Sequence, residues 1–201
     1  MKLIVVAVVS VFLFQENHPP VVKLTAPAAA STQSPLSYSI NVSDKEDGET
    51  KFDEINPNEI LLQVQYGDNA KKNDVSTLHA MMASNCMNCH TFKSKLIGPS
   101  YLDISNKYAA SDVATLAKHI KEGSKGIWGD IVMPTHPELT AEEINKMVNW
   151  IISYKGNKSS DFFLGREGSV QLQKSGKVTL TASYLDHQKT MGEDRVEIDV
   201  K

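Results

Sequence analysis

The sequence predicts an α+β protein with more than one domain, in which a helical block separates two segments of β-strands. In residues 38–42, hydrophobic and polar side chains alternate, which is the period of a strand with one buried face. Residues 144–152 instead carry hydrophobic side chains at the spacing of a helix with one buried face. The alternation returns in residues 178–184, so the order along the chain is β, then α, then β.

The composition is that of a globular protein with a small net charge. The chain has 201 residues, of which 41% are hydrophobic and 22% are charged, and its formal net charge is -3. A chain of this size and hydrophobicity can fill one good core or two small ones. Nucleic-acid binding needs a strongly basic surface, so we expect no nucleic acid among the partners.

The amino terminus carries an apolar run that suits an export signal. Lys2 precedes twelve mostly apolar residues, 3–14, a length typical of the core of a signal peptide and short for a membrane span. No small-x-small cleavage site follows this run directly. We therefore expect residues 1–16 to be a signal peptide, or an apolar anchor that tethers the chain to a membrane.

The segment of residues 17–70 is expected to form β-structure. Residues 38–42 and 60–66 each have the alternating pattern of a strand in a half-buried sheet. The polar loop of residues 43–48 between them is acidic. Calcium binding is one interpretation of this loop, but it lacks the full alternating ligand series of a calcium loop, and a solvated turn is the alternative.

Two helices are predicted in the middle of the chain. Hydrophobic residues at helical spacing follow Ser111 and predict the first helix. Thr140 and Glu143 form a capping box ahead of the second helix, and Gly156 is expected to end it. Three methionines on helical faces are expected to fill the core: Met81, Met82 and Met147.

The strongest chemical signal is the run Cys86-Met87-Asn88-Cys89-His90. Two thiols separated by two residues can form thioethers to the two vinyl groups of one haem, while the histidine binds its iron. A structural zinc site would need four ligands, and no second pair lies at a suitable spacing. A thioredoxin-like dithiol would need a preceding strand, whereas the residues before Cys86 predict a short helix. One covalently bound haem c is therefore the expected cofactor.

The second axial position of the haem iron needs a ligand from elsewhere in the chain. Met133 is the candidate, because it lies in a loop between two predicted helices and Pro134 stiffens the backbone after it. A thioether ligand favours ferrous iron and raises the reduction potential. His136 is the alternative, and it would give a bis-histidine haem of lower potential. His79 and His119 are expected to be exposed or to lie at boundaries.

Four motifs follow one another within residues 75–155. They are Cys86-Met87-Asn88-Cys89-His90, Ile97-Gly98-Pro99-Ser100-Tyr101, Gly123-Ser124-Lys125-Gly126-Ile127-Trp128-Gly129 and Val132-Met133-Pro134. Together they resemble the short bacterial class I cytochromes c. This resemblance implies an all-α fold around the haem, with the carbonyl of Pro99 accepting a hydrogen bond from the ring of His90. It also implies that Trp128 packs near a haem propionate or donates to it, with simple core packing as the alternative.

The flanking segments carry a looser resemblance. Residues 19–22 and 38–48 look like the opening of a polycystic kidney disease-type (PKD) immunoglobulin-like β-sandwich. Similar segments precede cytochrome c domains in secreted fusions with a quinoprotein sugar dehydrogenase, and such chains end in a stretch like residues 178–184. We expect residues 160–201 to complete one sandwich around an inserted cytochrome domain, or to form a separate small β appendage. This sequence lacks the β-propeller of the dehydrogenase ahead of the sandwich, so we expect it to act in trans or to be part of a longer fusion.

Three functions follow as alternatives. The first is one-electron transfer in the periplasm or another extracytoplasmic compartment, by a chain that is not itself an enzyme. Its redox partners would be an exported dehydrogenase and a respiratory oxidase or reductase chain. The second is a haem-based ligand sensor with a labile Met133. The third is a carbohydrate- or protein-binding β module with ancillary haem, although the aromatic content is only 7%. Lys93 and Lys95 are expected either to rim the haem edge or to be solvated.

Overall fold

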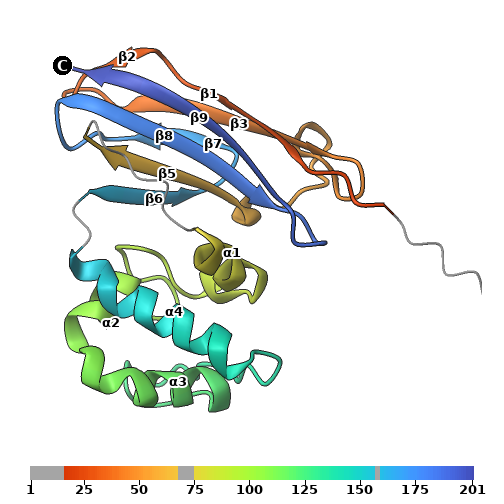
Figure 1. Ribbon diagram of the computed structural model, residues 1–201. Helices are drawn as coiled ribbons and strands as arrows, with labels where there is room; N and C mark the ends of the chain where they lie inside the picture. The colour runs from red at the N-terminus through yellow and green to blue at the C-terminus, as the bar shows by residue number, and fades with distance from the viewer. Residues whose placement is uncertain (1–15, 68–74, 157–158) are drawn as a thin grey trace, which may run out of the picture.

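Two β-sheets pack face to face in one half of the molecule (Figure 1). The structure is a computed structural model that describes residues 16–67, 75–156 and 159–201. In the four-stranded sheet, β3 pairs with three antiparallel neighbours. The other sheet has five strands in the order β2-β9-β8-β5-β6, and only β2 and β9 are parallel. The strands span β1 Val21–Thr25, β2 Ala29–Ala30, β3 Leu36–Asp44, β4 Gly48–Glu49, β5 Ile60–Tyr66, β6 Ser160–Leu164, β7 Glu167–Val170, β8 Gly176–Leu185 and β9 Met191–Val200.

The core between the sheets explains why these residues form strands. Along β3 the side chains of Tyr38, Ile40 and Val42 are buried while their neighbours are more exposed, because successive side chains of a strand point to opposite faces. Residues from both ends of the chain fill this core together. Strand β8 pairs with β5, and β7 pairs with β3. The two β segments therefore form one sandwich, and the C-terminal strands are not a separate appendage.

The acidic loop after β3 is held by hydrogen bonds within the protein. Asp44 Oδ1 accepts from the backbone N–H groups of Glu46 and Asp47. Asp47 in turn accepts from the hydroxyl of Tyr184 at 2.8 Å and from the backbone N–H of His187 at 2.9 Å. Among the described residues, no three histidine, cysteine, aspartate or glutamate side chains are grouped so that they could hold a metal ion. The loop is thus a structural turn that ties β3 to β8.

The other half of the molecule is helical. Its helices are α1 Ser76–Ala83, α2 Tyr101–Lys107, α3 Val113–Glu122 and α4 Ala141–Ser153. Helix α4 begins with the predicted capping box, in which Thr140 and Glu143 each accept from the other's backbone N–H. Met81, Met82 and Met147 are buried in the helical core, as the sequence predicted. Short 3₁₀ turns lie at Thr50–Phe52, Pro57–Glu59, Cys86–Asn88, Ala110–Asp112 and Tyr154–Gly156.

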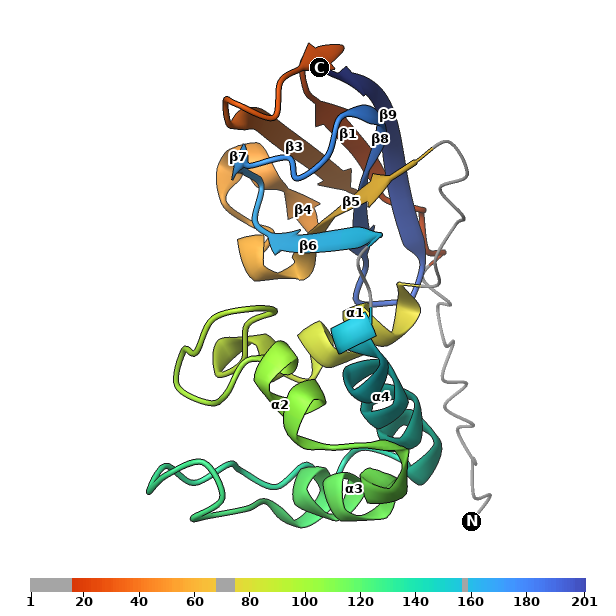
Figure 2. The same ribbon diagram turned by 90° about the vertical axis from the view of Figure 1, so that its left-hand side faces the viewer.

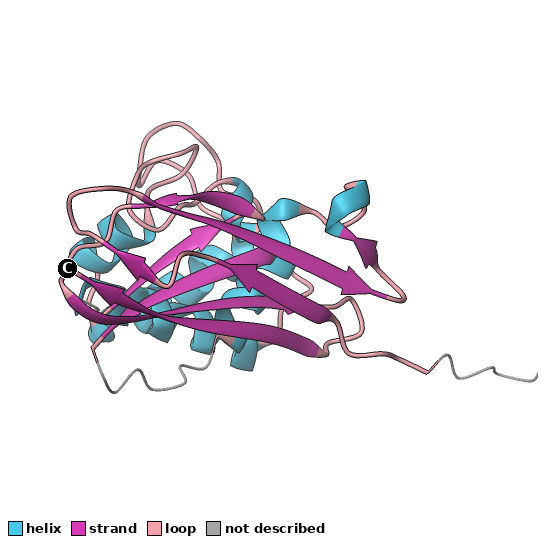
Figure 3. Ribbon diagram, turned by 90° about the horizontal axis from the view of Figure 1, so that it is seen from above, coloured by secondary structure: helices cyan, strands magenta, loops and turns pink. Residues whose placement is uncertain are grey.

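The helical block is inserted between two neighbouring strands of one sheet. Strands β5 and β6 pair side by side, and the chain leaves β5 for the helices and returns from them into β6 (Figure 2). The outward face of this sheet supplies Leu61 and Phe162 to the helical core. Seen from above, the strands of the sandwich lie in front of the helices and partly cover them (Figure 3).

A buried histidine joins the two halves. His79 on α1 is 2% exposed, and its Nε2 lies 2.9 Å from the hydroxyl oxygen of Ser183 on β8. The expectation that His79 is exposed or at a boundary was therefore wrong. Its burial depends on a strand that is 104 positions away along the chain, so local sequence could not indicate it.

Within the described residues, no helix has the length and apolar character needed to cross a membrane. The apolar run of residues 3–14, predicted as a signal peptide or anchor, lies outside the described part of the chain.

Candidate functional site

One cavity of about 350 Å³ lies within the helical block. All six residues singled out from the sequence line it: Cys86, Cys89, His90, Pro99, Trp128 and Met133. Apolar side chains from three helices make up much of the remaining wall, among them Ile104, Leu116, Ile120, Met147, Val148 and Ile151. The fold thus brings residues that are up to 47 positions apart in the sequence (Cys86 to Met133) to one cavity.

The two cysteines and the histidine are arranged by one tight turn after α1. Asn85 adopts a left-handed conformation with φ of 60°, which asparagine tolerates better than most residues, and a 3₁₀ turn follows. The backbone N–H groups of Cys89 and His90 both donate to the carbonyl of Cys86. The two cysteines form no disulfide, and burial raises the pKa of the Cys86 thiol to about 11.

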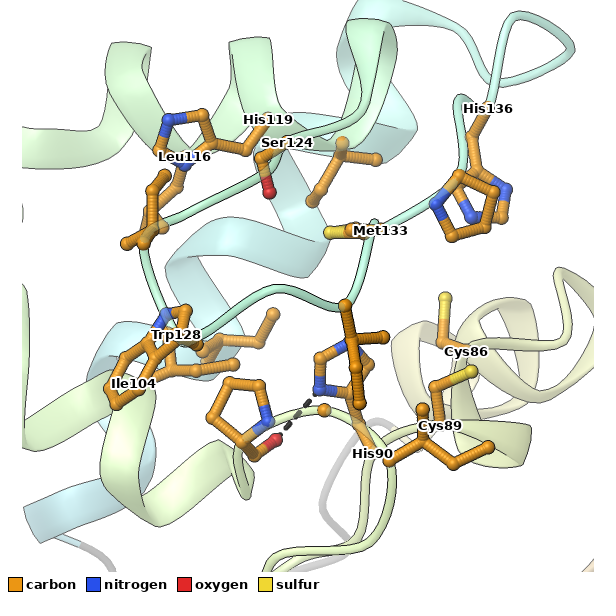
Figure 4. Close-up of a pocket in the computed structure, with 18 of the residues that line it drawn as sticks. Cys86, Cys89, His90, Ile104, Leu116, His119, Ser124, Trp128, Met133 and His136 are labelled. Carbon is orange, nitrogen blue, oxygen red and sulfur yellow. Dashed lines mark hydrogen bonds between the residues drawn. The ribbon is translucent and has the colours of Figure 1, made fainter.

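The ring of His90 is fixed from the side opposite the cavity. Its Nδ1 lies 2.7 Å from the carbonyl oxygen of Pro99 (Figure 4), so this nitrogen donates and Nε2 keeps its lone pair. Gly98 packs so closely that a Cβ there would lie 2.6 Å from the ring. Burial lowers the pKa of His90, and the hydrogen bond to Pro99 partly offsets this effect. The ring is therefore held neutral, as a metal ligand must be.

Met133 reaches the cavity from the wall opposite His90 (Figure 4). Its backbone forms a two-way bridge with Ser124, with N···O distances of 2.9 and 3.2 Å. Gly123 adopts φ of 78°, and a Cβ there would lie 2.7 Å from the carbonyl oxygen of Met133. This position needs glycine both for its left-handed conformation and for the close approach. The loop that carries Met133 is thus braced at its backbone.

Two residues that line the cavity, His136 and Trp128, also have partners outside it. His136 and His119 also line it, but the Nδ1 of His136 lies 2.9 Å from a carboxylate oxygen of Glu138. Trp128 is 38% exposed, and the ammonium of Lys107 lies 4.5 Å from its ring centroid. Trp128 is therefore a rim residue rather than a core residue.

The mouth of the cavity is apolar. Five large hydrophobic side chains that are more than a third exposed belong to the two loops that carry Pro99 and Met133: Leu96, Ile97, Trp128, Ile131 and Val132. Lys93 forms an ion pair with Asp161 on β6, so it joins the helical block to the sandwich. The Lys93 side chain is still 58% exposed, in agreement with the expectation of a solvated lysine, and its ion pair with a strand that is distant in the sequence is a contact that the sequence did not indicate.

The chemistry of this donor set fits haem c. An apolar cavity presents two thiols on one wall, an imidazole with a free nitrogen beside them, and a thioether on the facing wall. Thiols can attach to haem vinyl groups, and imidazole and thioether are its usual axial ligands in cytochromes c. Zinc would need further nitrogen, sulfur or carboxylate ligands, and the described residues form no such group.

Sequence reasoning missed one contact and one backbone requirement at this site. Tyr101 stacks on the ring of His90, with ring centroids 5.7 Å apart and planes at 26°. Gly123 is required by the carbonyl of Met133, as described above. Both residues lie inside the motifs singled out from the sequence, but the sequence alone did not indicate what they touch.

Comparisons with known proteins agree with this site. The family "Cytochrome C oxidase, cbb3-type, subunit III" matches residues 73–151. Cytochrome c-552 of Hydrogenobacter thermophilus is 42% identical over 72 residues, which are 35% of this chain and 72% of that protein. Cytochrome c-551 of Pseudomonas aeruginosa is 39% identical over 72 residues, 35% of this chain and 68% of that protein.

Among solved structures, the crystal structure of cytochrome c552 from Nitrosomonas europaea aligns with 32% identity and a TM-score of 0.37, over 41% of this chain and all of that chain. The two bacterial relatives above are matched over more than two thirds of their length. The chain therefore belongs to the class I mono-haem cytochromes c, electron carriers with one covalently bound haem c.

Proposed function

We propose that this chain passes single electrons outside the cytoplasm through one haem c attached at Cys86 and Cys89, with His90 and Met133 as the axial ligands of the iron. The observation that carries this proposal is the convergence of these four side chains on one apolar cavity. Haem supplies an iron that alternates between the ferrous and ferric states.

Each of the two proposed axial ligands is held in place by a different neighbour. The Pro99 carbonyl accepts from His90 Nδ1, which orients the imidazole and makes its free nitrogen a better donor. The bridge between Ser124 and Met133 holds the thioether in the facing wall. A thioether stabilises the ferrous state relative to a second imidazole. His136 also lines the cavity, and its pairing through Nδ1 with Glu138 leaves Nε2 free to bind. Met133 is preferred because its side chain lies in the wall that faces His90.

Electrons would enter and leave at the apolar mouth of the cavity. The exposed side chains of this mouth, including Ile97, Trp128 and Val132, form an apolar surface of the kind that marks a contact site for another protein. Residues 75–155 contain eight lysines and seven acidic residues, so long-range electrostatic steering is weak. Partners would therefore be recognised through apolar contact more than through charge.

We infer an exported dehydrogenase of the quinoprotein sugar type as the electron donor and a respiratory oxidase or reductase chain as the acceptor. The support is the looser resemblance of residues 17–70 and 160–201 to PKD-type sandwich segments, around a cytochrome domain at 75–155. Attachment of haem through thioethers and the apolar run of residues 3–14 support a periplasmic or other extracytoplasmic location. The same run is the candidate for a membrane tether.

The test is the optical spectrum of the full chain, matured in a periplasm with haem-attachment machinery, and of two variants. The reduced wild type should show sharp α and β bands. The oxidised wild type should show a weak near-infrared sulfur-to-iron charge-transfer band. Met133→Ala should lose the sulfur-to-iron band, and the matched control His136→Ala should keep it. A protein without haem would refute the proposal. A wild-type spectrum that lacks the sulfur-to-iron band, is unchanged in Met133→Ala and changes only in His136→Ala would move the axial role to His136.

A ligand-binding sensor is the second candidate. It is favoured by one observation, that two further imidazoles, His119 and His136, line the cavity and could contact a small molecule bound at the iron. This function predicts a high-spin fraction and binding of carbon monoxide without displacement of a strong ligand. A β module that binds carbohydrate is disfavoured, because Phe52 is the one exposed aromatic side chain among the described residues of the sandwich.

A further inference from the structure

Strand β6 carries two adjacent phenylalanines that serve different cores. Phe162 is 6% exposed and belongs to the core of the helical block, whereas Phe163 packs against the core of the sandwich. Their partners on β5 are Gln63 and Leu62, respectively, and neighbouring side chains on a strand point to opposite faces. The sandwich therefore contributes one aromatic ring to the core that encloses the cavity.

Phe162 is part of an aromatic cluster that extends to the cavity wall. Its ring centroid lies 5.5 Å from that of Phe92, 5.9 Å from Trp150 and 6.4 Å from Tyr154. Phe92 and Trp150 each contact Tyr101, with centroids 6.1 and 5.8 Å apart. These separations are those of favourable aromatic contacts. Tyr101 thus rests on two rings that themselves pack against Phe162.

Tyr101 in turn bounds the ring of His90. The two rings are stacked with centroids 5.7 Å apart, and Tyr101 is 2% exposed. Its hydroxyl oxygen has no hydrogen-bond partner among the described groups, so ring packing rather than a hydrogen bond holds Tyr101 in place. His90 also contacts Gly98 and the carbonyl of Pro99. The face of the imidazole against Tyr101 therefore depends on how tightly the aromatic cluster is packed.

We propose that Phe162 is a positioning residue for the haem: through Phe92, Trp150 and Tyr101, a side chain of the sandwich fixes the orientation of the His90 ring. Protein interiors are close-packed, and a void left by a truncated side chain is only partly filled by its neighbours. Shortening Phe162 would free the rings that support Tyr101 and let the imidazole tilt within the limits set by its hydrogen bond to Pro99. The inference rests on the proposed function, because it takes His90 as the iron ligand.

The test uses the haem-loaded full chain in the ferric state, observed by proton NMR. In low-spin ferric haem, the distribution of unpaired spin over the four haem methyl groups follows the orientation of the axial ligands. Phe162→Leu should redistribute the methyl shifts or give a second set of signals. The matched control is Phe163→Leu, which removes the same bulk from the sandwich core and should leave the methyl shifts at their wild-type positions, although it lowers the melting temperature.

Three further variants keep the inference testable. Tyr101→Phe retains the stacked ring and should keep the wild-type shifts, whereas Tyr101→Leu should reproduce the change seen in Phe162→Leu. If Phe162→Leu does not fold, Phe162→Met provides a substitute whose unbranched, flexible side chain can adapt to the space left by the ring, and a change of the same kind is expected for it.

Wild-type methyl shifts in a folded Phe162 variant would overturn the inference, as would equal changes in Phe163→Leu, which would indicate general loosening. A wild-type spectrum without low-spin haem ligated by His90 would instead overturn the proposed function itself.

Discussion

Acid should loosen the molecule through one buried histidine at the junction of its two halves. Burial lowers the pKa of His79 from 6.5 to about 4, and the ring contacts Ser183 across the junction. Above pH 6.5 the ring is neutral in both the folded and the unfolded chain, so its full contribution to stability is present. Between pH 6.5 and about 4, His79 is protonated in the unfolded chain but stays neutral in the folded chain. Stability therefore falls as the pH is lowered through this window.

The size of this effect follows from the pKa difference. One pKa unit corresponds to about 1.4 kcal/mol. The difference between the pKa of 6.5 in the unfolded chain and about 4 in the folded chain therefore means that lowering the pH from above 6.5 to about 4 removes about 3 kcal/mol of unfolding free energy. For a protein whose total stability is about 5–15 kcal/mol, such a loss is large. Carboxylates that titrate in the same range contribute to the acid profile of every variant, so the measured quantity is the difference between wild type and a His79 variant.

The assay is guanidinium unfolding of the haem-loaded full chain from pH 7.5 to pH 4, followed by circular dichroism and tryptophan fluorescence. The variant His79→Gln keeps an amide that can reach Ser183 but cannot titrate. Its stability relative to wild type should rise by about 3 kcal/mol on going from pH 7.5 to pH 4. In Ser183→Ala the His79 ring stays buried, so the unfolding free energy should still fall between pH 7.5 and pH 4. At each pH it should be lower than that of the wild type by about 1 kcal/mol, because the hydrogen bond to Ser183 is lost. Parallel pH profiles of wild type and His79→Gln would refute the reasoning.

Three other changes have definite expected outcomes. Gly98→Ala places a methyl 2.6 Å from the His90 ring and should shift the haem spectrum and lower the yield of loaded protein, while a wild-type spectrum would show that the ring can move without consequence. Thr140→Ala removes the cap of α4 and should cost about 1 kcal/mol of unfolding free energy, measured by denaturant titration; no loss would mean that the helix start does not limit stability. In the haem-free folded chain, the pKa of about 11 for Cys86 should make its alkylation by iodoacetamide much slower at pH 7.5 than in the urea-unfolded chain, which peptide mapping can follow; equal rates would contradict the burial of this thiol.

The parts of the fold that could be predicted from sequence are those with a simple hydrophobic period. Strand β3 has one buried face and alternates cleanly, and α4 combines a capping box with a buried stripe. Strand β6 lies in the segment of residues 160–201 that was expected to be β, but the sequence did not identify it as a strand, because its two faces are covered by different cores and its sequence does not alternate. Helix α2 was also missed, although the capping pair Ser100 and Asp103 is a start signal that the sequence carried.

At the site, short-range motifs were informative and long-range contacts were not. The spacing of Cys86, Cys89 and His90 indicated haem chemistry directly, since the three residues lie within one turn. The contacts of His79 with Ser183 and of Lys93 with Asp161 cross from the helical block to the sandwich. Both side chains looked like ordinary solvated residues along the chain, because only the docking of the two halves supplies their partners.

The insertion of the helical block between β5 and β6 has a consequence for the order of folding. Tyr66 and Asp161 are hydrogen-bonded neighbours at the edge of the sheet although 95 positions separate them along the chain. Closing such a long open loop in one step is entropically unfavourable and slow. If the helical block has already folded, it brings the chain segments that lead to β5 and β6 closer together. The conformational search that remains before the two strands pair is then shorter. Whatever stabilises the folded helical block therefore also favours the pairing of β5 with β6, and a chain in which the block folds late exposes the unpaired edge of β5 in the meantime.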